Sequence, residues 1–499
     1  MPTTSTLPSI IQGGMGAGIS DWRLARAVSS IGQLGVVSGT ALDAILARRL
    51  QVGDPGGHMR RALDHFPVPA IADRVWQRHY VAGGKQANRP FAPLPMHAKD
   101  ETPERLELLV VANFVEVYLA REGHGGRVGI NYLEKIQLPH LPSLYGAMLA
   151  DVDYVLMGAG IPVRIPGVLD RFVRHEAATY PLSVVGAQAG DDTTLSFDPR
   201  VTVSPDLPPL RRPNFLPIVA SHVLALTLIK RANGAVNGFV VEGATAGGHN
   251  APPRGKLRID EAGEPIYGER DVVNLEKIRG LGLPFWLAGG YGDRRMLEAA
   301  QAVGAAGVQV GTAFAFCEES GLRADYKRAL LHDVTAGKAR VFTDPRASPT
   351  GFPFKVAQLA GTMSDAAVHE ARSRVCDLGY LREAYRRDDA TVGFRCASEP
   401  VGAYQTKGGG AEETVGRKCI CNALIANIDL GQVRGRSVEP GIVTSGDDLS
   451  GVTRFMSPGT TRYTAADVIA AILAPDAVSE PLSDLLSSDG PRERVVDGV

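Results

Sequence analysis

Eight short apolar runs recur along the first two thirds of the chain, and most of them end in or beside glycine or a small polar residue. They lie at residues 10–12, 35–40, 127–133, 154–160, 215–221, 238–243, 285–290 and 307–314. Continuously apolar runs of this length, rich in β-branched residues, are typical of strands buried on both faces of a parallel sheet. We therefore expect eight buried strands.

Apolar positions at helical spacing separate several of these runs. Ser20 can cap a helix that Gly32 ends. Further helices are expected at residues 103–121, 141–149, 223–229 and 293–304. Strands alternating with helices in this number predict a (β/α)8 TIM barrel. The alternative is a doubly wound sheet, but the dinucleotide fingerprint expected after its first strand fails, because Ile19 stands at the third glycine position.

Three segments interrupt or follow the alternation. Residues 42–103 carry four histidines without metal-ligand spacing, so we expect no metal site there but an insertion with short helices over the barrel mouth. Residues 182–204 indicate a hairpin. The barrel is expected to span residues 1–345, and residues 346–499 a mostly helical extension packed on it. A capping box of Thr464 and Asp467 is expected to open the final helix, and the last ~20 residues are expected to fray.

Composition narrows the class of protein. The chain has 499 residues, of which 44% are hydrophobic and 21% charged, with a net charge of −1. This is ordinary for a globular enzyme and argues against a nucleic-acid partner. Five cysteines are few and odd in number, which favours a reducing compartment. With no secretory signal pattern and no apolar run long enough to cross a bilayer, we expect a cytoplasmic protein without a membrane partner.

Candidate chemistry lies at the ends of the expected strands, where barrel enzymes place their active sites. The sixth strand leads through two glycines to His249, which we interpret as functional; a loop histidine bonded only to backbone is the alternative. The seventh and eighth strands end in glycines and a threonine that can hold a phosphate: Gly289, Gly290, Gly311 and Thr312. Glycines after the first strand permit close approach of a flat ligand. A phosphorylated planar cofactor, FMN, fits these features.

Four motifs together resemble one family, the nitronate monooxygenases (2-nitropropane dioxygenases). They are Ile10-Ile11-Gln12-Gly13-Gly14-Met15-Gly16, Glu242-Gly243-x-x-Ala246-Gly247-Gly248-His249, residues 287–290 and residues 307–314. The resemblance covers about residues 8 to 320 and extends to flavin-dependent enoyl reductases and to the reductase partners of polyunsaturated-fatty-acid synthases. It implies an FMN-containing TIM barrel.

The resemblance also assigns roles to single residues. His249 falls on the active-site histidine, which accepts the substrate's α-proton or steers the nitronate. Gly13, Gly14 and Met15 would contact the flavin ring, Asn131 matches an asparagine on the third strand, and Gly247 and Gly248 would border the cofactor. Gly289, Gly290, Gly311 and Thr312 would hold its phosphate. Ser221, Lys135 and Arg346 are weaker candidates for contacting the cofactor or an anion.

The resulting expectation is an FMN-dependent oxidoreductase that oxidises alkyl nitronates with O2. Two alternatives stay open: an enoyl-thioester reductase using NAD(P)H, and a flavin-binding subunit of an acyl-processing assembly. The substrate depends on loops in which this chain departs from the family, namely residues 250–255, the insertion and the extension. Homo-oligomerisation is compatible with the sequence. Cys419 and Cys421 are interpreted as buried structural cysteines, with a redox or metal role as the alternative.

Overall fold

Eight parallel strands close into a barrel in the computed structural model, which describes residues 7–457 and 459–474. Their order around the barrel is β1-β12-β11-β9-β8-β4-β3-β2. The strands are β1 (Ile10–Gln12), β2 (Leu34–Ser38), β3 (Val128–Leu133), β4 (Tyr154–Gly158), β8 (Asn214–Val219), β9 (Phe239–Glu242), β11 (Phe285–Ala288) and β12 (Gly307–Val310). The expected TIM barrel is confirmed. The doubly wound sheet is wrong because β1 pairs with both β2 and β12, which leaves no open edge.

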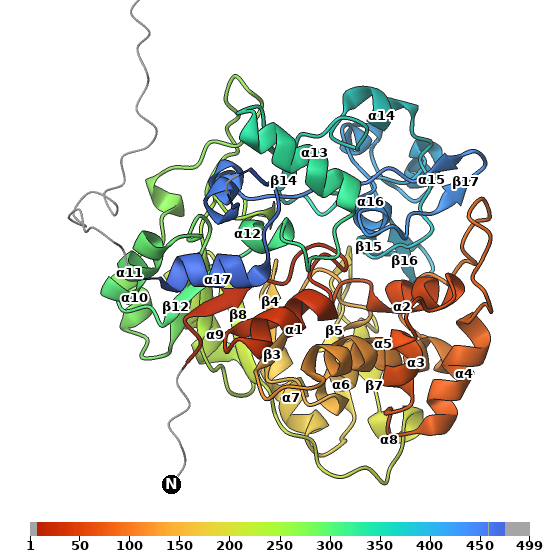
Figure 1. Ribbon diagram of the computed structural model, residues 1–499. Coiled ribbons are helices and arrows are strands. Elements are labelled where there is room, and N and C mark those ends of the chain that lie inside the picture. Colours follow the sequence, from red (N-terminus) through yellow and green to blue (C-terminus); the bar gives the residue numbers. More distant parts are fainter. Residues whose placement is uncertain (1–6, 458, 475–499) are drawn as a thin grey trace, which may run out of the picture.

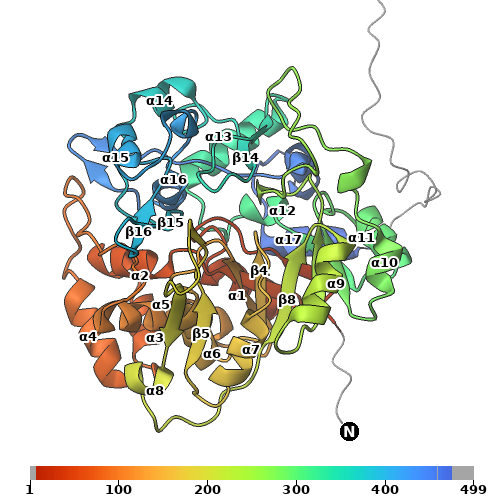
Figure 2. The same ribbon diagram turned by 180° about the vertical axis from the view of Figure 1, so that it is seen from behind.

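Helices surround the barrel (Figures 1 and 2). They are α1 (Trp22–Ser30), α5 (Pro103–Arg121), α6 (His140–Leu149), α7 (Ile165–Phe172), α9 (His222–Arg231), α10 (Leu275–Arg279) and α11 (Arg294–Ala302). Two further helices, α12 (Thr312–Ala315) and α13 (Ala324–Thr335), follow the last strand and lie on the side of the extension. The cap of α1 is Asp21, whose carboxylate accepts from the N–H groups of Arg23 and Leu24. The prediction of Ser20 as the cap was wrong because its hydroxyl is turned inward and donates to the Gly13 carbonyl at 2.9 Å.

Alternate strand residues fill the inside of the barrel, as the two-residue period of a strand requires. Val36, Leu156, Val240 and Trp286 are fully buried there. The Trp286 indole N–H donates to the Pro8 carbonyl at 2.8 Å, so its polar atom is satisfied inside the core. The barrel is therefore a packed core, and any ligand must bind at its end.

The insertion lies beside the barrel. Its helices α2 (Leu42–Gln51), α3 (His58–Leu63) and α4 (Pro69–His79) all pack against α5. Their buried apolar residues belong to the same core cluster as those of α5. The expectation that the insertion covers the barrel mouth was wrong, because these apolar faces are satisfied along α5. An antiparallel pair, β5 (Ala178–Pro181) with β7 (Thr194–Phe197), overlaps the hairpin expected at residues 182–204, but its first strand lies before residue 182.

Most of the extension lies at the carboxyl end of the barrel instead, as the teal and lighter blue segments of Figure 1 show, whereas its last helix packs against α1 and α11 at the side of the barrel. The extension mixes short helices with small sheets. Its helices are α14 (Ala366–Ala371), α15 (Val401–Thr406), α16 (Ile420–Ala426) and α17 (Ala465–Leu473), with 3-10 turns η2 (Ala411–Thr414) and η3 (Asp447–Phe455). Its strands are β14 (Phe354–Ala357), β15 (Glu383–Arg386), β16 (Val392–Arg395), β17 (Val433–Arg434) and β18 (Ser437–Val438), and β14 pairs with β13 (Val341–Asp344).

Two further expectations concern the end of the chain and membranes. The capping box of Thr464 and Asp467 is present at the start of α17. The expected fraying of the last ~20 residues lies outside the described residues. Within the described chain, no helix combines the length and apolar character needed to cross a membrane.

Candidate functional site

A cavity of about 430 Å³ lies at the carboxyl ends of the barrel strands. Its floor is made by the turns that follow β1, β3, β9, β11 and β12, and its roof by the extension. All the expected cofactor-binding residues except Ser221 line it: Gly13, Gly14, Met15, Asn131, Gly247, Gly248, Gly289, Gly290, Gly311 and Thr312. Glycines dispersed over the sequence are thus brought together around one space.

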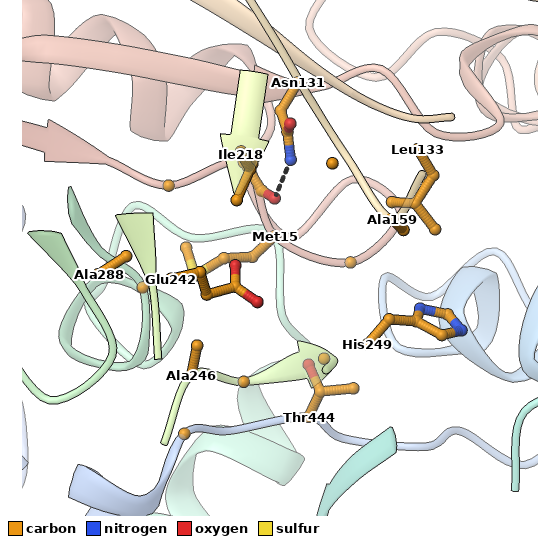
Figure 3. A pocket seen from close by; sticks show the side chains of 18 of the residues that line it. Met15, Asn131, Leu133, Ala159, Ile218, Glu242, Ala246, His249, Ala288 and Thr444 are labelled. Atoms are coloured by element: carbon orange, nitrogen blue, oxygen red, sulfur yellow. Dashed lines mark hydrogen bonds between the residues drawn. The ribbon is translucent and has the colours of Figure 1, made fainter. Parts of the chain in front are cut away.

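The turn after β1 is held rigidly against the cavity floor. Ser20 donates to the Gly13 carbonyl and accepts from the Met15 N–H, both at 2.9 Å. A Cβ on Gly14 would lie 2.5 Å from the Cβ of Asn131, so no larger residue fits there. The Asn131 amide donates to the Gly14 carbonyl at 3.1 Å (Figure 3). Its Oδ1 has no partner among the described residues, and this buried acceptor borders the cavity.

The ends of β11 and β12 form a second glycine-lined wall. Gly289 and Gly290 have φ values of +98° and +79°, which glycine adopts without the strain other residues incur. A Cβ on Gly289 would lie 2.7 Å from the Thr245 hydroxyl. Thr312 Oγ1 accepts from the Gly446 N–H of the extension at 2.9 Å. Among the described residues, no Lys or Arg lines the cavity, so an anion there would depend on backbone N–H groups and hydroxyls.

His249 is held by the extension rather than by the barrel. It lies on β10 (Gly248–His249), which pairs antiparallel with β14 so that His249 faces Phe354. Its Nε2 lies 2.8 Å from Ser348 Oγ, and the Phe354 ring centroid is 4.7 Å from the imidazole centroid. Burial, together with the positive charge of Lys135, lowers the pKa of His249 to about 4. The imidazole is therefore neutral at pH 7, whereas an unperturbed histidine titrates near neutrality.

Glu242 is a site residue to which the sequence assigned no role. Its side chain extends from the end of β9 into the cavity (Figure 3). Burial raises the pKa of its carboxyl to about 8. No hydrogen bond or ion pair of this carboxyl is found among the described residues. The motif that ends at His249 begins at Glu242, so a signal existed, but burial was needed to interpret it.

The three weaker candidates for contacting the cofactor or an anion do not line the cavity. The Ser221 hydroxyl accepts from the Leu224 N–H at 3.1 Å and caps α9. Lys135 places its ammonium 4.7 Å from the Phe352 ring centroid, beside His249 rather than in the cavity lining. Arg346 is exposed at the edge of the extension.

The two neighbouring cysteines, Cys419 and Cys421, lie in different surroundings. Cys419 is buried, and Cys421 is among the residues that line the cavity. In the part of the chain that the structure describes, no group of His, Cys, Asp and Glu is arranged to hold a metal ion.

The extension contributes a set of lining residues that the sequence analysis missed entirely. They are Phe352, Phe354, Tyr380, Leu381, Ile420, Cys421, Leu424, Thr444, Ser445, Gly446 and Asp448. Most are apolar, and two of them, Phe352 and Phe354, flank His249. Contacts this distant along the chain leave no local pattern in the sequence.

The carboxyl half of the barrel is similar to known proteins. The nitronate monooxygenase family matches residues 214–342. A nitronate monooxygenase of Pseudomonas aeruginosa is 40% identical over 114 residues, which are 23% of this chain and 31% of that protein. A carboxyl-CoA dehydrogenase of Mycobacterium tuberculosis, named for a hydroxy-methyl-oxo-octahydroindene substrate, is 32% identical over 102 residues, 20% of this chain and 25% of that protein. The matched part thus spans less than a third of these relatives.

Solved structures resemble the chain weakly over most of its length. Nitroalkane oxidase from Streptomyces ansochromogenes has 16% identity and a TM-score of 0.44, with 94% of this chain and 96% of that chain covered. FabK from Thermotoga maritima has 17% identity and a TM-score of 0.44, with 94% and 92% covered. The assignment of the barrel rests on the strand pairing described above. Through the match at residues 214–342, this part of the chain is similar to the nitronate monooxygenase family.

Proposed function

We propose that the protein is a flavin-dependent oxidoreductase that binds FMN and oxidises alkyl nitronates with O2. The observation that carries this proposal is the juxtaposition, at one barrel mouth, of two glycine-lined walls with a neutral histidine. The family relationship supports the same class of enzyme.

The cavity fits such a cofactor on three grounds. Its volume of about 430 Å³ lies within the usual range of small-molecule sites. A Cβ at Gly14 would meet Asn131 and one at Gly289 would meet Thr245, so at both turns the backbone itself, without a side chain, lines the cavity and a flat ligand can approach it. Buried acceptors without partners, Asn131 Oδ1 and Gln309 Oε1, lie on lining residues and offer sites for the N–H groups of a ring.

Each wall would hold a different part of the cofactor. Gly289, Gly290, Gly311 and Thr312 would bind the phosphate through backbone N–H groups and one hydroxyl. Gly13, Gly14, Met15 and Asn131 would border the ring, with Gly247 and Gly248 opposite them. The flavin, when bound, supplies the electron transfer and the reaction with oxygen.

His249 would act on the substrate. A pKa of about 4 makes its imidazole a weak base, so abstraction of the α-proton of a neutral nitroalkane would be inefficient. A nitronate has already lost that proton, and a neutral imidazole can donate one N–H to its oxygens without introducing a charge. The lowered pKa therefore favours a nitronate and a steering role for His249.

A second candidate is an enoyl-thioester reductase that uses NAD(P)H. The apolar residues Tyr380, Leu381, Ile420 and Leu424 in the cavity lining favour it, because such a wall can accept an acyl chain. The relative from Mycobacterium tuberculosis is named for a carboxyl-CoA compound.

Anaerobic mixing of the purified protein with an alkyl nitronate, and separately with NAD(P)H, distinguishes these functions. Bleaching of the flavin by nitronate alone is expected. Bleaching by NAD(P)H, followed by reduction of an enoyl thioester, would favour the reductase. Failure of both would favour a flavin-binding subunit, and a protein that binds no flavin would refute all three.

A further inference from the structure

Four of the five cysteines of the chain lie together in the extension. They line a small cavity of about 10 Å³: Cys376, Cys396, Cys419 and Cys421. A space of this size holds about one water-sized molecule. Leu381, Ile420 and Cys421 line both this small cavity and the main one, so the cysteines lie directly behind part of the wall of the main cavity.

We infer that Cys376 and Cys396 are a redox site, which hydrogen peroxide joins in a disulfide and a dithiol reductant opens again. The sulfur of one thiol attacks the O–O bond of the peroxide, gains one oxygen as a sulfenic acid, and one water is released. The sulfur of the other thiol then attacks the sulfenic sulfur, the S–O bond breaks, and a second water leaves. One peroxide is thus reduced for each disulfide formed. The inference does not rest on the proposed function.

One hydrogen bond selects this pair among the four cysteines. The Cys376 thiol is hydrogen-bonded to Cys396. With Cys419 and Cys421, by contrast, Cys376 interacts only electrostatically. Cys376 and Cys396 are therefore the two sulfurs that need the least movement to form a bond.

Position disfavours the other pairs. The Cys419 sulfur accepts from the Asn422 amide at 3.4 Å. Cys421 follows two residues after Cys419 in the first turn of α16, and residues at this spacing do not face each other on a helix. Cys317 is fully buried beside the barrel, where its thiol donates to the Phe314 carbonyl at 3.2 Å.

The backbone around the pair can adjust. Cys376 lies in an irregular segment and Cys396 directly follows β16, so neither belongs to a helix or a strand. A disulfide requires Cα atoms about 4.4–6.8 Å apart, and an approach to this separation breaks no hydrogen bond of a helix or sheet. Cys376 is partly exposed and Cys396 is buried, so a small oxidant can reach the pair from the side of Cys376.

Positive charge surrounds the pair. Arg382 interacts electrostatically with both sulfurs, and Arg374 with Cys396. Both guanidiniums donate to backbone carbonyls, and within the described residues neither pairs with a carboxylate. Glu399 accepts from the Cys396 N–H at 3.3 Å, but its charge is balanced by Lys407 at 2.7 Å. A cationic environment favours the thiolate, which is the form that attacks a peroxide.

The hydrogen bond between the two thiols restrains this reactivity. It raises the pKa of Cys376, and burial adds to the rise. At neutral pH at most one of the two sulfurs is therefore ionised. The pair is expected to stay reduced at rest and to be oxidised only when peroxide is present, as is usual for disulfides in a reducing compartment.

The disulfide would fasten part of the wall of the main cavity. It closes a loop of residues 376–396, which contains β15 and β16 paired with each other. The same loop carries Tyr380 and Leu381, and both line the main cavity. Oxidation therefore restricts the movement of a segment that borders any ligand bound there.

The test is peptide mapping of protein that has been reduced, treated with hydrogen peroxide and then blocked with N-ethylmaleimide in denaturant. We expect a cross-linked peptide that joins Cys376 to Cys396, the loss of two of the five thiols, and the recovery of both with dithiothreitol. The melting temperature is expected to rise on oxidation, because the disulfide restricts the unfolded chain.

Serine variants identify the sulfurs involved. Cys376→Ser and Cys396→Ser are each expected to abolish the cross-link and the rise in melting temperature. Cys419→Ser is the matched control, since Cys419 lines the same small cavity, and it is expected to keep both effects.

Three results would overturn the inference, and the wild-type protein alone can give each of them. The first is a cross-link between any other pair of cysteines. The second is the absence of a cross-link at peroxide concentrations that oxidise free cysteine. The third is a stoichiometric zinc ion in the purified protein, because the sulfurs would then be metal ligands.

Discussion

Two titratable side chains that border the cavity, His249 and Glu242, have pKa values moved in opposite directions by the same cause. Burial disfavours the charged form of each, which lowers the pKa of His249 to about 4 and raises that of Glu242 to about 8. Asp448, a third titratable lining residue, is paired with Arg454 at 3.0 Å. At pH 7, His249 and Glu242 are therefore both largely uncharged and add no net charge to the cavity lining.

Replacing His249 tests its role directly. His249→Ala is expected to keep bound flavin, because the glycine walls remain, and to lose about 10² to 10³ in kcat, the usual cost of removing one hydrogen-bond donor to a reacting oxyanion. The measurements are the visible flavin spectrum and nitronate-dependent O2 consumption. His332→Ala, on the exposed side of α13, is the control. Unchanged turnover would remove His249 from the mechanism.

Glu242→Gln tests the neutral carboxyl through stability. The folded pKa of about 8 exceeds that of a free glutamate, about 4.3. The folded protein therefore holds an extra proton between these values, and its stability falls as pH rises through this window. In the apoprotein, the free energy of unfolding of Glu242→Gln is expected to exceed that of the wild type by about 1–3 kcal/mol near pH 8 and to equal it near pH 4. Urea unfolding at both pH values provides the measurement, and Glu261→Gln, at an exposed position, is the control. If Glu242→Gln and Glu261→Gln showed the same pH dependence of stability, the raised pKa of Glu242 would be contradicted.

At the scale of elements, short strands bring distant glycines to one edge of the barrel. The prediction of these strands from sequence succeeded because each is a continuous apolar run, and parallel pairing places all their carboxyl ends together. The helix boundary at Ser20 failed because two adjacent residues could cap α1, and the inward hydrogen bonds of Ser20 decided between them.

Gly289→Ala tests the proposed phosphate wall at the end of β11. The added Cβ would lie 2.7 Å from Thr245 Oγ1, at a φ of +98°. FMN affinity, measured by fluorescence quenching with apoprotein, is expected to fall by about tenfold or more, since a loss of 1.4 kcal/mol already gives that factor.

Gly282→Ala is the matched control for this element. It has a φ of +73° with nothing within 4 Å of the added Cβ, and it precedes β11 at the opposite end of the barrel. Both variants incur a backbone cost of about 1–2 kcal/mol in stability. Equal FMN affinity for the two variants would place the phosphate elsewhere.

At the scale of the whole molecule, one buried cluster joins the insertion, the barrel helix α5 and the extension. Asp43 pairs with Arg105 at 2.6 Å and accepts from the Tyr380 hydroxyl at 2.8 Å. His97 lies 3.4 Å from Asp43 and 2.6 Å from Glu101. Because Tyr380 also lines the cavity, the cluster connects the site to the outer helices.

Asp43→Asn tests this connection. Burial by itself would raise the pKa of Asp43, but Arg105 and His97 hold it well below its usual range. Removing the charge leaves Arg105 buried without its partner, and we expect a loss of about 3 kcal/mol in the free energy of unfolding. Urea unfolding of wild type and variant provides the measurement. A loss close to zero would show that the cluster contributes no stability.

His97 gives the cluster a pH dependence. Burial opposes its protonation, but hydrogen bonds to Asp43 and Glu101 outweigh burial and raise its pKa above 6.5. The stability that protonated His97 gives the folded protein is therefore complete below pH 6.5 and is lost as the pH rises through the higher pKa of the folded state. His97→Gln is expected to remove this slope, measured by urea unfolding across that range, whereas a slope that persists would assign it to another group.

The sequence by itself determined the eight strands, the glycines at their ends, the capping box of α17 and His249 as the candidate for chemistry. These depend on local patterns: apolar runs, turn residues and motif spacing. The tertiary structure alone decided that the extension covers the mouth, that Ser348 holds His249 across 99 residues of chain, and that Glu242 belongs to the site. The physical reason is that burial and long-range hydrogen bonds, which set the pKa of each group, exist only once the distant segments have packed together.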